Sequence, residues 1–97
     1  MQTYFILETG TAAGAATVRE APKRSEGVIS AGERMGVKIH EWFFTLAPFD
    51  FIMKVEAPND ETVAAFVMAI NASGNVHAKF YRAYTPGEWK DIVARLP

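Results

Sequence analysis

The sequence predicts a single α+β domain whose elements follow the order strand, helix, strand, strand, helix, strand, with one further helix at the C-terminus. Two apolar strand patterns lie close together on either side of Pro48, which predicts a hairpin. A stretch with helical periodicity lies on each side of this hairpin. A further strand pattern lies near each end of the chain.

The first half of the chain predicts a strand, a loop and a long helix. Tyr4–Glu8 is short, aromatic and β-branched, as is typical of a strand, and Gly10 ends it. The Ala-rich segment Thr11–Glu20 is predicted to be a loop with one helical turn. Pro22 suits the first turn of a helix, where its missing N–H needs no partner, and Gly36 ends that helix. Its predicted buried face carries Val28, Ile29, Gly32 and Met35.

The middle of the chain predicts the hairpin and a second long helix. Val37–Leu46 and Phe49–Glu56 are the two strands, joined too closely for a crossover connection. The helix that follows has Asn59 or Asp60 as its cap, with acidic charge at the positive end of the helix dipole, and Gly74 stops it. The predicted buried stripe of this helix is Val63, Phe66, Val67 and Ile70.

The last quarter predicts a fourth strand and a terminal helix. Asn75–Tyr84 is the strand. Thr85–Glu88 has the spacing of a capping box, with Pro86 at the first helical position. The terminal helix is predicted to bury Trp89, Ile92, Val93 and Leu96.

This order is that of the split βαβ, or ferredoxin-like, fold. Because both crossovers should be right-handed, both long helices are expected on one face of a four-stranded antiparallel sheet. The other face stays open unless the terminal helix covers it. What lies on that face decides what the protein can bind.

Alternation along each strand predicts which residues lie on the open face. In the second strand, Val37, Ile39 and Phe43 are predicted to face inward. Trp42 is therefore predicted to face outward. The inward residues of the third strand are predicted to be Phe49, Phe51, Met53 and Val55. The predicted outward residues of all four strands are Tyr4, Ile6, Glu8, His40, Trp42, Phe44, Asp50, Ile52, Lys54, Glu56, His77, Lys79 and Tyr81. An apolar patch this broad is rarely left to water, so we expect a partner or a ligand to cover it, most simply a second copy in a two-fold homodimer.

The length, charge and composition of the chain exclude several classes of function. The 97 residues make one domain, 1–97, and the net charge of −1 gives no basic footprint for nucleic acid. The chain has no cysteine and no His spacing typical of a metal site, so we expect neither a metal nor another cofactor. The N-terminus lacks the pattern of a signal peptide or a membrane span, and a soluble cytoplasmic protein is expected.

Seven short motifs along the whole chain resemble the GYD domain family, small proteins of the dimeric α+β barrel type. The motifs are T-x-x-G at Thr11–Gly14, P-K-R at Pro22–Arg24, Gly36, F-D at Phe49–Asp50, E-A-P-N-D at Glu56–Asp60, G-N-V at Gly74–Val76 and R-A-Y-T at Arg82–Thr85. The name-giving Gly-Tyr-Asp stands here as Pro48-Phe49-Asp50, so the tyrosine and the glycine are absent while the aspartate is kept. The resemblance implies the fold and a dimer but no established activity.

His40 and Asp50 are the candidate catalytic residues, and each has a structural alternative. Asp50 could act as a base or accept N–H groups of its own turn. His40 and His77 can titrate near neutral pH, but they lie on strands predicted at opposite edges of the sheet, so a surface or interface role is also open. The predicted ligand-binding residues on the open face are Tyr4, Trp42, Phe44, Asp50, Ile52, Lys54 and Tyr81.

Three functions fit these residues. The first is a non-enzymatic dimer that binds a small apolar or aromatic molecule on its open sheet face. The second is a cofactor-independent oxygenase, isomerase or decarboxylase in which His40 or Asp50, facing an enclosed pocket, acts as a base on an aromatic substrate. The third is an assembly module whose open face is filled entirely by its partner. The fold alone does not choose among them.

Overall fold

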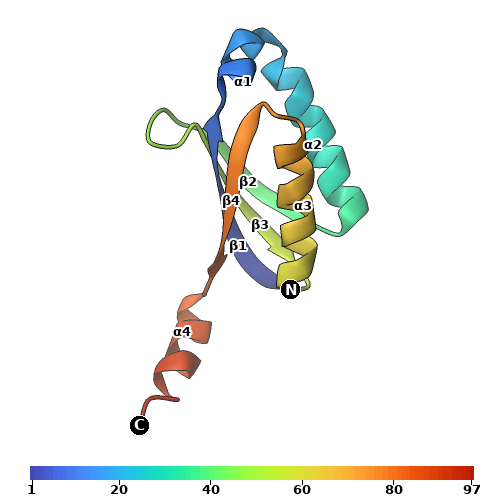
Figure 1. Cartoon of the computed structure of the whole chain (residues 1–97). Helices are drawn as coiled ribbons and strands as arrows, with labels where there is room; N and C mark the ends of the chain where they lie inside the picture. Colours follow the sequence, from blue (N-terminus) through green and yellow to red (C-terminus); the bar gives the residue numbers. More distant parts are fainter.

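Four antiparallel strands form one sheet in the order β2-β3-β1-β4, as seen in a computed structural model that describes residues 1–97 (Figure 1). The strands are β1 (Gln2–Gly10), β2 (Lys38–Phe44), β3 (Phe51–Ala57) and β4 (Val76–Ala83). The first and last strands of the chain therefore lie side by side, and the hairpin strand β2 is at the far edge. The predicted ferredoxin-like fold is confirmed.

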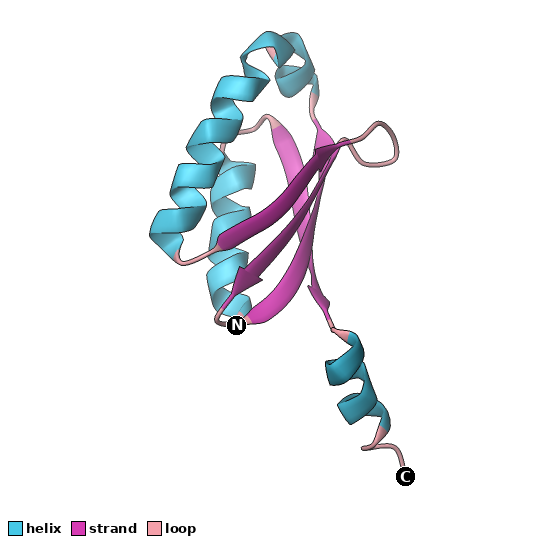
Figure 2. Cartoon of the chain, turned by 180° about the vertical axis from the view of Figure 1, so that it is seen from behind, coloured by secondary structure: helices cyan, strands magenta, loops and turns pink.

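Helices cover one face of the sheet and leave the other bare (Figure 2). The helical elements are α1 (Ala12–Ala16), a 3₁₀ turn (Val18–Glu20), α2 (Ala21–Met35), α3 (Asp60–Ala72) and α4 (Pro86–Val93), and of these α4 does not lie on the covered face. The long helices α2 and α3 lie side by side on the covered face. The segment predicted to be a loop with one helical turn is more helical than expected, since α1 and the 3₁₀ turn fill most of it.

The helix ends have the local chemistry that the sequence predicts. Gly36 follows α2 in the left-handed conformation, with φ of 84°, which a residue with a side chain rarely adopts. The Asn59 side chain accepts a hydrogen bond from the N–H of Thr62 and caps α3. Thr85 and Glu88 form a reciprocal capping box at the start of α4.

The core lies between the sheet and α2 and α3, and it shows that the predicted faces of β1 were reversed. The predicted α3 stripe is buried as expected. Tyr4, Ile6 and Glu8, predicted outward, are instead buried against the helices. They share a face with Met53 of β3, which is fully buried. Because both sets of alternate positions in β1 are largely apolar, alternation could not decide which set faces inward.

A β-bulge reverses the predicted faces in the second half of β2. The register with β3 shifts between Ile39 and Glu41, so one extra residue is inserted there. Beyond the shift, Trp42 pairs with inward-facing Met53 and packs against the core, whereas Phe43 turns outward and is 59 % exposed. The predictions of an outward Trp42 and an inward Phe43 were therefore wrong.

The two hairpin strands are shorter than predicted because Thr45–Asp50 forms a loop. The N–H and hydroxyl of Thr45 donate to the carbonyl oxygens of Asp50 and Phe49, both at 2.6 Å, and the Ala47–Pro48 peptide bond is cis. Phe49 is thus a loop residue and not an inward strand residue as predicted. Phe44 pairs with Phe51 and stacks edge-to-face on it at 5.4 Å, but it is 65 % exposed at the end of the strand.

The terminal helix α4 extends away from the rest of the chain, on the side opposite to α2 and α3 (Figure 1). None of its residues is buried, and Trp89, Val93 and Leu96 are exposed. The prediction that this helix buries its apolar residues was wrong for a single chain. No helix of the structure is long and apolar enough to cross a membrane.

Candidate functional site

The open face of the sheet has an apolar centre surrounded by charged residues of both signs. Strand pairing places Leu7 beside Ile52, Ile52 beside Phe43, and Phe5 beside Tyr81. Phe5, Phe43 and Tyr81 are 39 %, 59 % and 48 % exposed. We call these five residues, Phe5, Leu7, Phe43, Ile52 and Tyr81, the open-face patch. No helix of the same chain lies over it (Figure 2).

Only part of the predicted ligand-binding set lies on this face. Ile52, Lys54 and Tyr81 occupy outward positions of β3 and β4, as predicted. Tyr4 and Trp42 lie on the helix side, so they cannot contact a ligand held on the open face. Phe44 shares its face with Phe51 on the helix side. The open face carries Phe5, Leu7 and Phe43 instead of Tyr4, Trp42 and Phe44. Once the bulge is known, the alternation of β2 identifies Phe43 as an outward residue.

The two candidate bases are held in structural contacts. His40 Nε2 lies 2.5 Å from Glu56 Oε1, on the outward side of β2 and β3. Asp50 Oδ2 accepts a hydrogen bond from the backbone N–H of Gly10 at 2.5 Å, and the N–H of Asp50 donates to the carbonyl of Glu8. The Asp50 side chain therefore ties the hairpin loop to the end of β1, and does not accept N–H groups of its own turn as the structural alternative supposed. His77 lies on β4, at the opposite edge of the sheet from His40.

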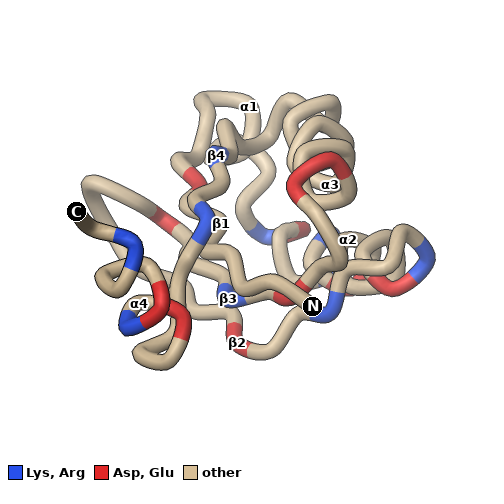
Figure 3. Tube along the Cα trace, turned by 90° about the horizontal axis from the view of Figure 1, so that it is seen from below, with Lys and Arg blue, Asp and Glu red and all other residues tan.

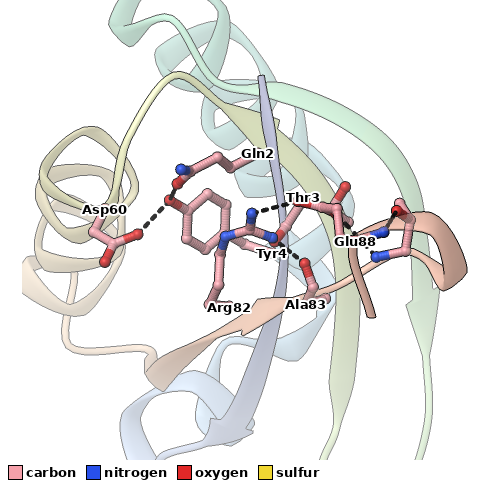
Figure 4. Close-up of polar contacts among 8 residues, drawn as sticks. Gln2, Thr3, Tyr4, Asp60, Arg82, Ala83 and Glu88 are labelled. Atoms are coloured by element: carbon pink, nitrogen blue, oxygen red, sulfur yellow. Dashed lines mark hydrogen bonds and ion pairs between the residues drawn. The ribbon is translucent and has the colours of Figure 1, made fainter. Parts of the chain in front are cut away.

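Tyr4 and Arg82 form a polar network on the helix side near the N-terminus (Figure 4). The Tyr4 hydroxyl lies 2.5 Å from Asp60 Oδ1, and burial and this bond raise the pKa of Tyr4 to about 12. The Arg82 guanidinium lies over the Tyr4 ring and donates to Glu88 Oε2 at 2.7 Å. The network connects β1 to the start of α3 and fixes α4 relative to β4 through Glu88. Tyr4 is therefore buried as a structural residue of this network.

A separate cavity lies between the sheet and the helices α2 and α3. Glu8 and Trp42 line it, whereas His40 and Asp50 do not. The enzyme hypothesis required one of these two bases to face an enclosed pocket, and the structure places neither there. Sequence reasoning missed Glu8 because an ionisable residue on an alternating strand is normally assigned to solvent. No group of three or more His, Cys, Asp or Glu side chains comes together as a metal site.

Charge is spread over the whole molecule. Acidic and basic segments both occur in several parts of the trace in the view from below (Figure 3). The net charge is −1. A surface of this kind offers contacts of both signs to a partner.

Comparison with known proteins identifies the family. A family model described as "GYD domain" matches residues 4–93. The chain belongs to the GYD domain family. A relative from Thermus thermophilus is named "Glutamine synthetase and cystathionine beta-lyase binding protein" and is 33 % identical over 97 residues. The alignment covers 99 % of this chain and 99 % of the relative.

The fold of this GYD protein has a counterpart among solved structures. The crystal structure of FFRP-DM1 superposes with a TM-score of 0.61 and 19 % sequence identity, covering 87 % of this chain and 100 % of that one. At this identity the likeness concerns the fold alone. The GYD protein is thus a small ferredoxin-like domain whose relative is named for binding other proteins.

Proposed function

We propose that this GYD protein is a non-enzymatic binding protein that works as a homodimer, with the open-face patch as the contact between the two copies. The observation that carries the proposal is the uncovered apolar patch at the centre of the sheet, with Phe5, Phe43 and Tyr81 all more than a third exposed. A contiguous apolar surface of this kind marks an interaction site in a protein of this size.

A second copy suits this face better than an unrelated partner. The patch is surrounded by basic and acidic side chains, among them Lys54, Lys79, Glu41 and Glu56. A two-fold interface brings the same surface of both copies together, so a face that carries both signs can pair with itself. The exposed apolar residues of α4 extend away from the chain and would also be covered by the second copy.

The relative's name supports a role in contacting enzymes. That protein is named as binding glutamine synthetase and cystathionine beta-lyase, and it aligns over almost its full length. We propose that the dimer contacts the corresponding enzymes of its own organism. The catalytic alternative gains no support, since His40 and Asp50 both have structural partners. A small apolar ligand on the open face, predicted from the sequence, stays a prediction and requires space inside the dimer.

The dimer is tested by placing a charge in the patch. Ile52→Glu should raise the dissociation constant about 100-fold or more, because two carboxylates would be buried without partners. Met68→Glu is the matched control, since Met68 is 71 % exposed on the outer side of α3. Sedimentation equilibrium measures both. A wild-type chain that stays monomeric at high micromolar concentration, or an Ile52→Glu chain as dimeric as wild type, contradicts the proposed interface.

The enzyme contact needs its own measurement. Immobilised wild-type protein should bind purified glutamine synthetase or cystathionine beta-lyase from the same organism in a surface-binding assay. Failure to bind either enzyme would contradict the proposed partners. It would not affect the proposed dimer interface, which the sedimentation experiment tests separately.

A further inference from the structure

The cavity between the sheet and the helices has the size and lining of a small-molecule site. Its volume is about 330 Å³, at the lower end of the range for ligand pockets. Small side chains on the helix side leave this space open, and three aromatic side chains form part of the wall. The lining includes Glu8, Arg24, Ala31, Trp42, Phe51 and Phe66.

Glu8 is the only acidic residue that lines this cavity, and its carboxyl has no hydrogen-bond or ion-pair partner in the chain. It is 2 % exposed, and its carboxyl makes no hydrogen bond or ion pair with another residue. Burial raises the pKa of Glu8 to about 7, so near neutral pH a large fraction of the carboxyl is protonated. A protonated carboxyl can donate one hydrogen bond and accept another. Buried polar groups are almost always hydrogen-bonded, which makes an unpaired carboxyl on a cavity wall a candidate ligand contact.

The remaining lining favours an uncharged aromatic ligand. Trp42 and Phe51 meet edge-to-face at 6.2 Å, and Phe66 is fully buried. The indole N–H of Trp42 is also buried without an acceptor. Arg24 is the one other charged residue of the lining, and its guanidinium donates to the carbonyl and hydroxyl of Thr17. A ligand anion would be repelled by ionised Glu8, and a ligand cation would share the cavity with Arg24.

We propose that this cavity binds a neutral aromatic molecule that carries a hydroxyl group, with the hydroxyl hydrogen-bonded to Glu8. The ring lies against the aromatic wall, and the hydroxyl gives the buried carboxyl the partner that the chain lacks. A hydroxyl both donates and accepts, so it can pair with either protonation state of Glu8. This site is on the opposite side of the sheet from the open-face patch and stands independently of the proposed dimer.

The test compares two probes that differ only in the hydroxyl, 4-ethylphenol and ethylbenzene. The chain has two tryptophans, so its NMR spectrum has two indole N–H signals, which Trp89→Phe assigns. The Trp42 signal should shift on titration with 4-ethylphenol, while the signal of Trp89, on α4, should not. Binding of 4-ethylphenol should be about tenfold tighter than binding of ethylbenzene, as expected for one hydrogen bond to a carboxyl.

Substitutions at Glu8 and on the wall separate the site from non-specific binding. Glu8→Leu should remove the preference for 4-ethylphenol, whereas Glu8→Gln, which keeps a donor and an acceptor, should retain most of it. Ala31→Phe fills the space from α2 and should abolish binding of both probes. Equal affinity of the two probes for wild type, or a preference that survives Glu8→Leu, would overturn the proposal. Binding unaffected by Ala31→Phe would overturn it as well, and circular dichroism checks that each variant is folded.

Discussion

At the scale of single residues, Glu8 makes the stability of the folded chain depend on pH. Burial raises the pKa of this carboxyl from 4.5 to about 7. Between these values the folded state holds a proton that the unfolded chain has lost, so the free energy of unfolding falls as the pH rises through this window. The full shift corresponds to about 3 kcal/mol.

Glu8→Gln should remove this contribution. Urea unfolding at pH 5 and pH 8 should show a loss of stability in the wild type that is about 3 kcal/mol larger than in the variant. The other titratable groups are common to both chains and cancel in the comparison. Parallel pH profiles would show that Glu8 is ionised in the folded state across this range.

The burial of Glu8 could not be predicted from the sequence. Glu8 shares its face with Tyr4 and Ile6, and strand alternation predicted this set to face outward. The structure buries all three: burial raises the pKa of the Glu8 carboxyl to about 7, and the Tyr4 hydroxyl is bonded to Asp60. In β2 one extra residue changed the alternation for every position beyond it. Neither outcome is encoded in a short-range pattern, because each depends on contacts between distant strands and helices.

At the scale of elements, residues of the family-like motifs T-x-x-G and G-N-V make structural contacts with each other. Thr11 caps α1 by accepting from the N–H of Gly14, and its hydroxyl donates to the carbonyl of Gly74 at 2.6 Å. The N–H of Thr11 donates to the carbonyl of Asn75. T-x-x-G and G-N-V, far apart in the sequence, therefore form one contact. The helix caps and the apolar stripe of α3 were predictable from the sequence because each satisfies backbone groups or the core through residues near in the chain.

Gly14 should be the most sensitive position of that contact. A Cβ there would overlap the backbone oxygen of Asn75, so Gly14→Ala should destabilise the fold by about 2 kcal/mol or more. Gly27 is the matched control: it lies within α2, and a Cβ there meets nothing within 4 Å. Gly27→Ala should stabilise by roughly 0.5–1 kcal/mol through helix propensity. Thermal unfolding measures both, and equal effects of the two substitutions would contradict the close contact.

At the scale of the whole molecule, the shape is more extended than that of a compact chain of this length. The radius of gyration is 14.7 Å, whereas a compact chain of this length is expected near about 12.5 Å. The excess comes from α4, which the Arg82–Glu88 ion pair and the capping box hold in a fixed direction. The apolar side of an amphipathic helix normally packs against a hydrophobic core. The apolar side of α4 has no such core in its own chain.

Removal of α4 distinguishes a helix that packs on the second copy from one that is dispensable. A chain that ends at Thr85 should fold with nearly unchanged monomer stability, because α4 contributes no buried residue. Its dimer dissociation constant should rise at least about tenfold, since Trp89, Val93 and Leu96 would lose the apolar contacts expected in the dimer. Replacing Lys90 and Asp91 with alanine in the full chain is the control, because it alters α4 without removing these apolar residues. Sedimentation equilibrium and circular dichroism measure association and folding. A truncated chain that associates as tightly as the full chain would mean that α4 lies outside the dimer contact and that the open-face patch alone holds the two copies together.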